Sequence, residues 1–249
     1  MQGLLLGSED CPPHLGVASV PGRAPLLDVR DLFCGFSGTP VCGPVTLSVE
    51  PGQIVSMVGA NGAGKSTVLR TITGRQEALA GAVHFAGLPR REDSAAWRRS
   101  VAAVFDDDAW FPGLSVEEHL RLVAAGHGLT DPGEVVAREL EFFGLSARAH
   151  ALPDALSSGQ RRRLLLAAAF LRPAEVLFLD EPEQRLDPTM VAALADRLLA
   201  HARAGACAVV ITHHPGFLTT VSTRCLLIDS TVVEVDPAQG AALISGAPR

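Results

Sequence analysis

The stretch Gly59-Ala60-Asn61-Gly62-Ala63-Gly64-Lys65-Ser66 fits the phosphate-loop pattern G-x-x-x-x-G-K-[ST] at every fixed position. The apolar run at 54–58 predicts a buried strand before it. Residues 68–73 predict a helix after it, with Gly74 as the stop. Glycines between a strand and a helix let successive backbone N–H groups turn toward an anion, which a Cβ would obstruct. The sequence therefore predicts a site for the phosphates of a nucleotide.

The same loop supplies side chains suited to a nucleoside triphosphate. Lys65 reaches the β- and γ-phosphates, and the positive N-terminal end of the following helix adds to its attraction. Ser66 offers a hydroxyl to Mg²⁺, and Thr67 is available to the α-phosphate. A glycine-rich turn that binds nothing is the alternative, but Lys65 and Ser66 in register favour the nucleotide. The predicted contacts are Gly59, Asn61, Gly62, Ala63, Gly64, Lys65, Ser66 and Thr67.

Length and charge restrict the class of protein. With 249 residues, the chain is long enough for one large α/β domain or two small ones. The formal net charge is −6, and the only basic run is Arg161-Arg162-Arg163. A protein whose main partner is nucleic acid usually carries a larger basic face, so we do not expect such a partner here.

Cysteine usage and hydropathy indicate the compartment. The cysteines show no C-x-x-C pair and no metal-ligand spacing, which indicates reduced thiols in the cytosol. They are Cys11, Cys34, Cys42, Cys207 and Cys225. The apolar run at 3–7 is too short for a signal peptide, and no apolar run reaches the roughly 18 residues of a membrane span. We therefore expect the chain not to span a membrane.

Apolar patterning along the chain predicts strands that alternate with helices, which is typical of an α/β fold. We expect strands at 26–33, 45–49, 54–58, 81–85, 101–105, 176–179 and 206–211, with a strand pair at 225–235. We expect helices at 68–73, 94–100, 115–125, 131–143, 161–171, 188–204 and 214–221. The run at 176–179 is apolar on both faces, as a central parallel strand is.

One domain is expected over residues 26–249, after a mobile proline-rich tail at 1–25. The strands at 26–33 and 45–49 are expected to form an antiparallel arm. A helical insertion is expected at about 110–170. Within it, Ser115 and Glu118 have the spacing of a capping box, which predicts the start of a helix.

Two acidic residues follow the apolar strand at 176–179. Asp180 and Glu181 come directly after it, and ligands of open parallel sheets gather at the carboxyl ends of strands. Asp180 is then placed to hold Mg²⁺ opposite Ser66, and Glu181 to orient or deprotonate the attacking water. Two acids after a strand can also cap a helix, so the catalytic interpretation depends on the phosphate loop upstream.

Two further motifs carry polar groups to helix and strand ends. The run Leu156-Ser157-Ser158-Gly159-Gln160 precedes an apolar helix, where small residues permit close approach to an anion. An ordinary serine-capped helix is the alternative. His213 follows the strand at 206–211 at the same expected sheet edge as Asp180. A polar strand terminus is the alternative for this histidine.

In their order along the chain, these motifs resemble the ATP-binding cassette subunit of an ABC transporter, over residues 26 to about 235. The segment at 156–160 is similar to the family's signature LSGGQ, which separates ABC proteins from other phosphate-loop nucleotidases. Leu186-Asp187 resembles the family's D-loop, and His213 its switch histidine. The resemblance implies a phosphate-loop NTPase fold of ABC type. Such a fold has a mixed sheet, an antiparallel β arm and an inserted α-helical subdomain.

The resemblance also implies ligands and partners. ATP and Mg²⁺ are the expected ligands, and Glu181 and His213 the catalytic residues. Phe36 stands where the family carries an adenine-stacking aromatic; a buried core phenylalanine is the alternative. A second cassette is expected to supply its signature to the γ-phosphate, and a transmembrane permease is the expected second partner. Through that permease, the chain is expected on the inner face of the cell membrane. The expected contacts outside the phosphate loop include Ser157, Ser158, Gly159, Gln160 and Asp187.

The chain departs from the family pattern at three places. The family's Q-loop glutamine, which touches Mg²⁺ and contacts the transport domains, aligns with Asp106, so we expect Asp106 to ligate the metal. Ser158 replaces a signature glycine. Glu183-Gln184-Arg185 replaces the small residues usual before the D-loop. These departures concern hydrolysis and domain coupling more than ATP binding.

The function indicated is an ATPase subunit that powers a separate membrane-spanning partner through ATP-dependent dimerisation, as a homodimer or heterodimer. A soluble ABC ATPase of repair, translation or cluster assembly is a second hypothesis, but the sequence has no tandem cassette, long coiled coil or basic arm. A degenerate cassette that binds ATP as a regulatory half of a heterodimer is the third. The presence of Lys65, Asp180, Glu181 and His213 argues against it. The permease largely determines the substrate and direction of transport, so the sequence predicts neither.

Overall fold

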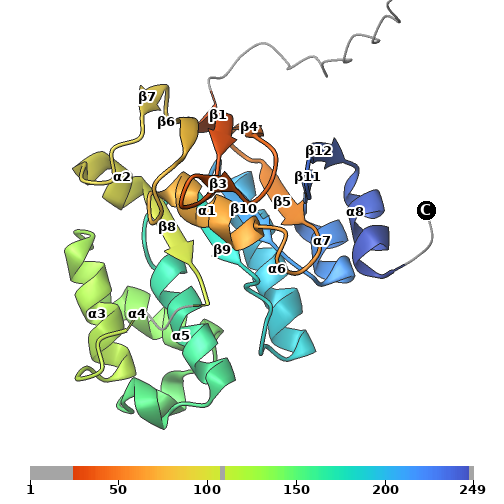
Figure 1. Ribbon diagram of the computed structural model, residues 1–249. Helices are drawn as coiled ribbons and strands as arrows, with labels where there is room; N and C mark the ends of the chain where they lie inside the picture. Colours follow the sequence, from red (N-terminus) through yellow and green to blue (C-terminus); the bar gives the residue numbers. More distant parts are fainter. Residues whose placement is uncertain (1–24, 107–109, 247–249) are drawn as a thin grey trace, which may run out of the picture.

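A six-stranded sheet forms the centre of the structure (Figure 1), a computed structural model that describes residues 25–106 and 110–246. Its strand order is β12-β11-β5-β10-β9-β8, and every neighbouring pair is parallel except β11 with β12. The strands are β5 (Ile54–Val58), β8 (Val101–Val104), β9 (Val176–Asp180), β10 (Cys207–Ile211), β11 (Arg224–Ile228) and β12 (Val232–Val235). Because β5, β10 and β9 are neighbours, the motifs that follow them meet at one edge of the sheet.

Helices cover this sheet because its strands are apolar at successive positions. The helices are α1 (Lys65–Thr73), α2 (Ala95–Ser100), α3 (Val116–Gly126), α4 (Pro132–Phe142), α5 (Ser158–Phe170), α6 (Pro188–Arg203), α7 (Pro215–Val221) and α8 (Pro237–Ile244). In β9, Leu177 and Leu179 belong to a core shared with α3–α6. Val176 and Phe178 belong to a second core shared with α1. Successive strand side chains point to opposite faces, so one apolar run serves both cores.

The antiparallel arm is confirmed as a four-stranded sheet of order β4-β1-β6-β7. Its strands are β1 (Leu27–Phe33), β4 (Val45–Val49), β6 (Ala80–Phe85) and β7 (Leu88–Pro89). Buried residues of β1, β4 and β6 share the second core with α1, which ties the arm to the helix after the phosphate loop. A short hairpin of β2 (Gly35–Phe36) and β3 (Thr39–Pro40) connects β1 to β4.

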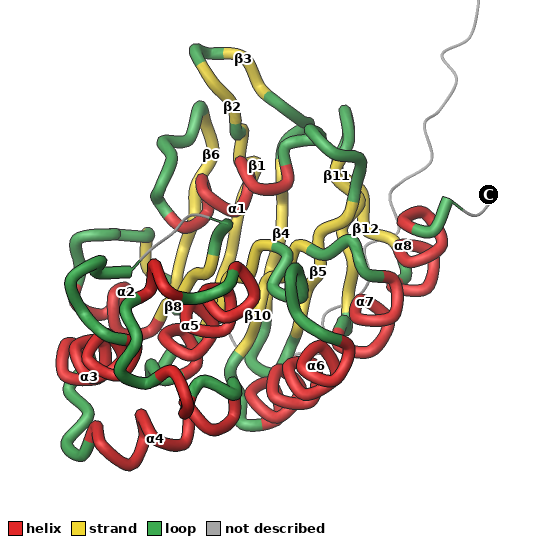
Figure 2. Tube along the Cα trace, turned by 90° about the horizontal axis from the view of Figure 1, so that it is seen from below, coloured by secondary structure: helices red, strands yellow, loops and turns green. Residues whose placement is uncertain are grey.

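The helical insertion consists of α3, α4 and α5 with two 3₁₀ turns, Ser146–Arg148 and Pro153–Ala155. In both views these helices lie together on one side of the sheet, away from α7 and α8 (Figures 1 and 2). The predicted capping box starts α3: the Ser115 hydroxyl accepts from the Glu118 N–H, and the Glu118 carboxylate accepts from the Ser115 N–H. The helix start that the sequence predicted at Ser115 is therefore confirmed.

Several predicted boundaries were wrong by a few residues, and short elements were missed. The helix predicted at 161–171 begins at Ser158, because Ser157 and Gln160 form a capping box that the sequence analysis did not use. The helix predicted at 68–73 begins at Lys65, directly after left-handed Gly64. The β2–β3 hairpin and β7 are too short for an alternating pattern. Helix α8 was missed although Asp236 caps its start.

Three further sequence expectations concern the termini, membrane spans and thiols. The tail expected at 1–25 lies outside the described residues apart from Pro25. Among the helices of the described ranges, none is long and apolar enough to cross a membrane. The cysteines within those ranges are free and buried. Burial raises the pKa of Cys34 to about 11 and the pKa values of Cys207 and Cys225 to about 12, so these thiols are protonated at neutral pH.

Candidate functional site

The phosphate loop connects β5 to α1 through glycines, and at two of them, Gly59 and Gly64, a larger residue would displace its neighbours. Gly59 has a φ of 152° and Gly64 a φ of 94°. A Cβ on Gly59 would lie 2.2 Å from the carbonyl oxygen of Ile228, and one on Gly64 would lie 2.5 Å from Cγ2 of Val41. The loop is therefore packed between the end of β11 and the segment that follows the β2–β3 hairpin.

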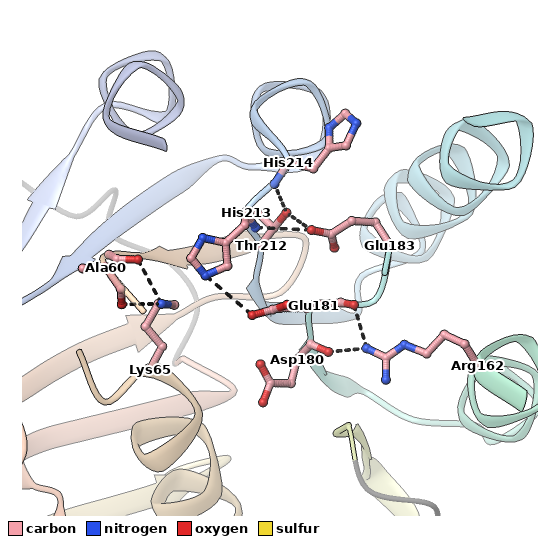
Figure 3. Close-up of polar contacts among 10 residues, drawn as sticks. Ala60, Lys65, Arg162, Asp180, Glu181, Glu183, Thr212, His213 and His214 are labelled. Atoms are coloured by element: carbon pink, nitrogen blue, oxygen red, sulfur yellow. Dashed lines mark hydrogen bonds and ion pairs between the residues drawn. The ribbon is translucent and has the colours of Figure 1, made fainter. Parts of the chain in front are cut away.

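Lys65 places a buried ammonium group inside this loop. Its side chain is 6% exposed, and Nζ donates to the carbonyl oxygens of Gly59 and Ala60, both at 2.9 Å (Figure 3). Burial lowers the pKa of Lys65 against the opposing effect of the carboxylates Glu181 and Asp180. A phosphate group beside Nζ would add negative charge that favours the ammonium form.

A cavity of about 710 Å³ opens beside the loop and gathers side chains from distant parts of the sequence. It is lined by Phe36, Val41, Asn61, Gly62, Gly64, Lys65, Ser66, Thr67, Glu181, Gln184 and His213. Phe36 is 60% exposed, so it is not the core residue that was its alternative interpretation. An aromatic ring at one side and cationic Lys65 at another suit the base and the phosphates of a nucleotide.

Asp180 and Ser66 join the end of β9 to the start of α1. Asp180 is 5% exposed, and its carboxylate accepts a hydrogen bond from the Ser66 hydroxyl. Burial raises the pKa of Asp180, although the bond from Ser66 lowers it. A hydroxyl and a carboxylate are hard oxygen donors that Mg²⁺ accepts alongside phosphates and water, so this pair fits the metal. Residues 25–106 and 110–246 contain no group of three or more His, Cys, Asp or Glu side chains arranged to hold a metal. Phosphate oxygens and water would therefore have to complete the coordination shell.

Glu181 is held in a conformation that few non-glycine residues adopt. Its φ is +48°, in the left-handed region, and its N–H donates to the carbonyl oxygen of Ile211 at 2.8 Å. His213, from the loop after β10, lies opposite it, with Nε2 at 3.5 Å from the Glu181 carboxylate (Figure 3). Such a backbone persists only where its surroundings hold it. The β9–α6 turn and the β10–α7 loop together therefore set the position of Glu181.

Arg162, from α5, is hydrogen-bonded to the same turn, although in the sequence it stands out only as part of a basic run. It is 3% exposed on α5 and donates to the carbonyl oxygens of Asp180, Glu181 at 2.7 Å and Phe105 at 2.8 Å. A guanidinium has enough donors to serve three acceptors at once. The helical insertion is thereby hydrogen-bonded to the ends of β8 and β9.

The signature segment lies at the start of α5 and does not line the cavity. Ser157 and Gln160 bond to each other's backbone N–H groups, at 3.0 and 3.2 Å. A Cβ on Gly159 would lie 2.6 Å from the carbonyl oxygen of Arg185, which leads into the D-loop. The N-terminal end of α5, with Ser158 and Gly159, therefore lies beside the D-loop and outside the cavity at the chain's own phosphate loop.

The D-loop residue Asp187 is the N-cap of α6 and is joined to the signature helix. Its carboxylate accepts from the N–H of Met190 at 3.0 Å and forms an ion pair with Arg163 of α5. Asp187, like the signature, does not line the cavity. The signature and the D-loop of one chain thus form a single connected surface.

Asp106 forms an ion pair with Arg185 at 3.1 Å and does not line the cavity. Both side chains are exposed, 61% and 44% respectively. The pair joins two of the places where the chain departs from the family pattern. The metal role of Asp106 stays a prediction.

The structure thus brings some of the predicted residues together in one cavity and leaves others outside it. The cavity collects Phe36, Asn61, Gly62, Gly64, Lys65, Ser66, Thr67, Glu181 and His213, and Asp180 joins them through Ser66. Gly59 and Ala63 belong to the loop without lining the cavity, as Asp106, Asp187 and residues 157–160 also do not. Sequence reasoning missed Val41, Arg162, Glu183 and Gln184. A charged residue within the apolar helix predicted at 161–171 was the available signal for Arg162.

Comparison with known proteins agrees with this geometry. The family model described as ABC transporter matches residues 42–184. This chain belongs to the ABC transporter family. It is 36% identical over 189 residues to the cytochrome c biogenesis ATP-binding export protein CcmA of Cupriavidus pinatubonensis, covering 76% of this chain and 84% of that protein. It is 33% identical over 196 residues to the glutamate/aspartate import ATP-binding protein GltL of Escherichia coli (strain K12), covering 76% and 81%. The solved structure of an ATP-binding subunit of an ABC transporter matches with a TM-score of 0.78 and 29% identity, covering 89% of this chain and 95% of that one.

The chain is accordingly an ATP-binding, ATP-hydrolysing subunit of the ABC transporter family. Its mixed parallel sheet, antiparallel arm and inserted helices are the fold expected of such a cassette. An export protein and an import protein match the same share of this ABC cassette, 76%.

Proposed function

We propose that this ABC cassette binds ATP with Mg²⁺ in the 710 Å³ cavity and hydrolyses it to drive a separate membrane-spanning permease. The observation that carries the proposal is the meeting of Lys65, Glu181 and His213 in one cavity, from three segments far apart in sequence. A lysine for the phosphates, a carboxylate for the water and a histidine beside it form the set that phosphoryl transfer to water requires.

In the proposed mechanism, Lys65 and the loop amides hold the β- and γ-phosphates, and Phe36 stacks on the base. Glu181 accepts a proton from water as the water oxygen bonds to the γ-phosphorus and the bond to the bridging oxygen of ADP breaks. His213 orients Glu181 and the γ-phosphate. Ser66 and Asp180 would hold Mg²⁺, which would supply positive charge to the triphosphate.

The proposal includes a head-to-tail dimer with a second cassette. Support comes from the signature, whose Ser158 and Gly159 start a 13-residue helix but do not line their own chain's cavity. A helix N-terminus with small residues suits the γ-phosphate of a neighbouring subunit. Ser157 and Gln160 would then act by holding this helix end in place, and Asp187 by supporting it through Arg163.

The permease is proposed to dock on a second cavity, of about 440 Å³, between the end of β8 and helices α3 and α5. Phe111 and Leu122 at this cavity are 53% and 46% exposed, so two large apolar side chains reach the surface beside the same cavity, where a partner could cover both. Docking there would hold the cassette on the inner face of the cell membrane. Because Phe105 at this cavity bonds through its carbonyl to Arg162, the docking surface is connected to the β9–α6 turn.

This docking proposal is tested by co-purification of the cassette with its permease in detergent. We expect Leu122→Glu to reduce co-purification and permease-stimulated ATP hydrolysis by roughly tenfold, because a charge would be buried in the contact. ATP affinity of the isolated cassette should not change. Leu88→Glu, at a 70% exposed leucine of the antiparallel arm, is the matched control. Equal co-purification of both variants with wild type would reject this cavity as the docking surface.

The proposed metal role of Asp106 predicts an unusual dependence on Mg²⁺. A carboxylate suits the metal but repels the γ-phosphate when the metal is scarce, so hydrolysis should rise more steeply with Mg²⁺ than in a cassette with glutamine there. Asp106→Gln should flatten the titration, and Asp106→Ala should lower the rate at every Mg²⁺ concentration. Superimposable titrations for wild type and both variants would show that Asp106 serves only Arg185.

A further inference from the structure

Glu183 is a buried carboxylate that the mechanism above does not use. It lies in the β9–α6 turn and is 8% exposed. Its Oε1 accepts from the Thr212 hydroxyl at 2.5 Å and from the N–H of His213 at 3.3 Å (Figure 3). Its Oε2 is buried and has no hydrogen-bond partner in the described part of the chain. One oxygen therefore makes two bonds while the other makes none.

A carboxylate buried at position 183 loses its hydration, which costs free energy of folding. Burial raises the pKa of Glu183, and the nearby Glu181 carboxylate raises it further, whereas the bond from Thr212 lowers it. The buried guanidinium of Arg162 offsets part of the charge without bonding to it. An apolar side chain of similar size would avoid the desolvation of a carboxylate. Stability alone therefore does not explain a glutamate at this position.

The bonds of Glu183 join the two loops that carry the reacting side chains. Glu181 and Glu183 share the β9–α6 turn, and Thr212 and His213 share the β10–α7 loop. The atom that Glu183 holds on His213 is its backbone nitrogen, from which the imidazole extends toward Glu181. In Figure 3 the bonds of Glu183 and the His213–Glu181 contact both span the gap between these loops.

The network continues beyond these loops into α7. Thr212 is fully buried, and its hydroxyl oxygen also accepts from the N–H of His214 at 3.0 Å. The His214 ring nitrogen Nδ1 then accepts from the N–H of Phe217 at 3.0 Å and caps the start of α7. The loop that carries His213 is thus fixed at both ends, by β10 and by the cap of α7, while Glu183 holds its middle.

We propose that Glu183 is a positioning residue for ATP hydrolysis, which holds His213 opposite Glu181 through its bonds to the Thr212 hydroxyl and the His213 N–H. This inference rests on the proposed function, since it acts through His213 and Glu181. It assigns a role to a residue where the family usually carries a small side chain. Because Glu183 does not touch the nucleotide, it should affect the rate of hydrolysis and not the binding of ATP.

The test compares Glu183→Ala with Glu183→Gln in the permease complex. Glutamine keeps an acceptor oxygen at nearly the same place, whereas alanine removes it. We expect Glu183→Ala to lower kcat by about tenfold or more with KM for ATP within about twofold, and Glu183→Gln to restore kcat to within about threefold of wild type. Asp196→Ala removes an exposed acid from α6 and should behave as wild type. A kcat unchanged in Glu183→Ala, or one that Glu183→Gln does not restore, would overturn the inference.

Thr212→Val tests the same bond from its other side. If the hydroxyl and the carboxylate act as one unit, Glu183→Ala with Thr212→Val should be no slower than the slower single variant. If the rate losses of the two single variants multiply in the double variant, the two residues act separately, and the positioning role is rejected.

A measurement on the nucleotide-free chain separates this inference from the proposed function. Hydrogen exchange of the His213 amide should be at least about tenfold faster in Glu183→Ala than in wild type and should return to the wild-type rate in Glu183→Gln. Exchange that is equal in all three chains would overturn the inference even if the complex hydrolyses ATP. Absence of Mg²⁺-dependent hydrolysis in the wild-type complex, with altered exchange in Glu183→Ala, would reject the proposed function alone.

Discussion

Glu181→Gln is expected to lower ATP turnover by about a hundredfold or more and to leave ATP affinity intact. The carboxylate lies in the cavity 3.5 Å from His213, on a turn held by Arg162, so its position is set before ATP binds. Glutamine has nearly the same shape but cannot accept a proton from water at neutral pH. The measurement is steady-state hydrolysis in the permease complex, together with nucleotide binding by the isolated chain.

Lys65→Ala provides the contrast to this variant. It removes the ammonium group that lies against the loop, so it should weaken nucleotide binding itself. Glu181→Gln with full turnover in the complex would show that another group activates the water. Lys65→Ala with unchanged affinity would place the phosphates outside this loop.

Ser157→Arg is expected to abolish the ATP-dependent dimer and, with it, nearly all hydrolysis. Ser157 is the N-cap of the signature helix, and a long charged side chain there would occupy the space that a neighbouring subunit's γ-phosphate needs. ATP affinity of the monomer should change little, because the signature does not line its own chain's cavity. Light scattering of the Glu181→Gln chain with ATP, alone and with candidate partner cassettes, measures the dimer.

The control for that experiment is Ser146→Arg, the same replacement at an exposed serine in the first 3₁₀ turn of the insertion. In the Glu181→Gln background, Ser146→Arg should dimerise as well as the Glu181→Gln chain alone, which is the parent chain here. A strictly monomeric parent in every setting, or a Ser157→Arg chain that dimerises as well as its control, would count against the head-to-tail arrangement.

The sequence predicted best those parts of the site whose chemistry lies within one short segment. The phosphate loop is recognisable because Gly64, Lys65 and Ser66 must be contiguous to surround a phosphate group. The apolar strand before Asp180 is equally easy to recognise in the sequence, because a central parallel strand is apolar on both faces. Fold class followed from such strands alternating with helices.

Contacts between distant segments could not be predicted in this way. The bond of Arg162 to Phe105 spans 57 residues, and that of Glu183 to Thr212 spans 29. Each of these residues has an ordinary local setting: a basic run in one case and an acid near a helix start in the other. Only the pairing of β9 with β10 and β8 brings their partners within reach. The start of α5 was misplaced because its cap, Ser157, lies inside the signature, which was expected to precede the helix.

Two contacts join the signature helix to the segment before α6: Gly159 lies against the Arg185 carbonyl, and Arg163 pairs with Asp187. They bear on the order in which the two ATP molecules of a dimer are hydrolysed. In the proposed dimer, the signature of one chain contacts the ATP bound by its neighbour. The β9–α6 turn of the same chain, which includes Arg185, lies instead at the ATP that this chain binds itself. A shift of this turn after one γ-phosphate is lost would move the signature over the other. In that dimer each site would sense the occupancy of its neighbour, so we expect the dependence of hydrolysis on ATP concentration to be sigmoidal. Two ATP molecules would then be consumed as a coordinated pair rather than as independent events.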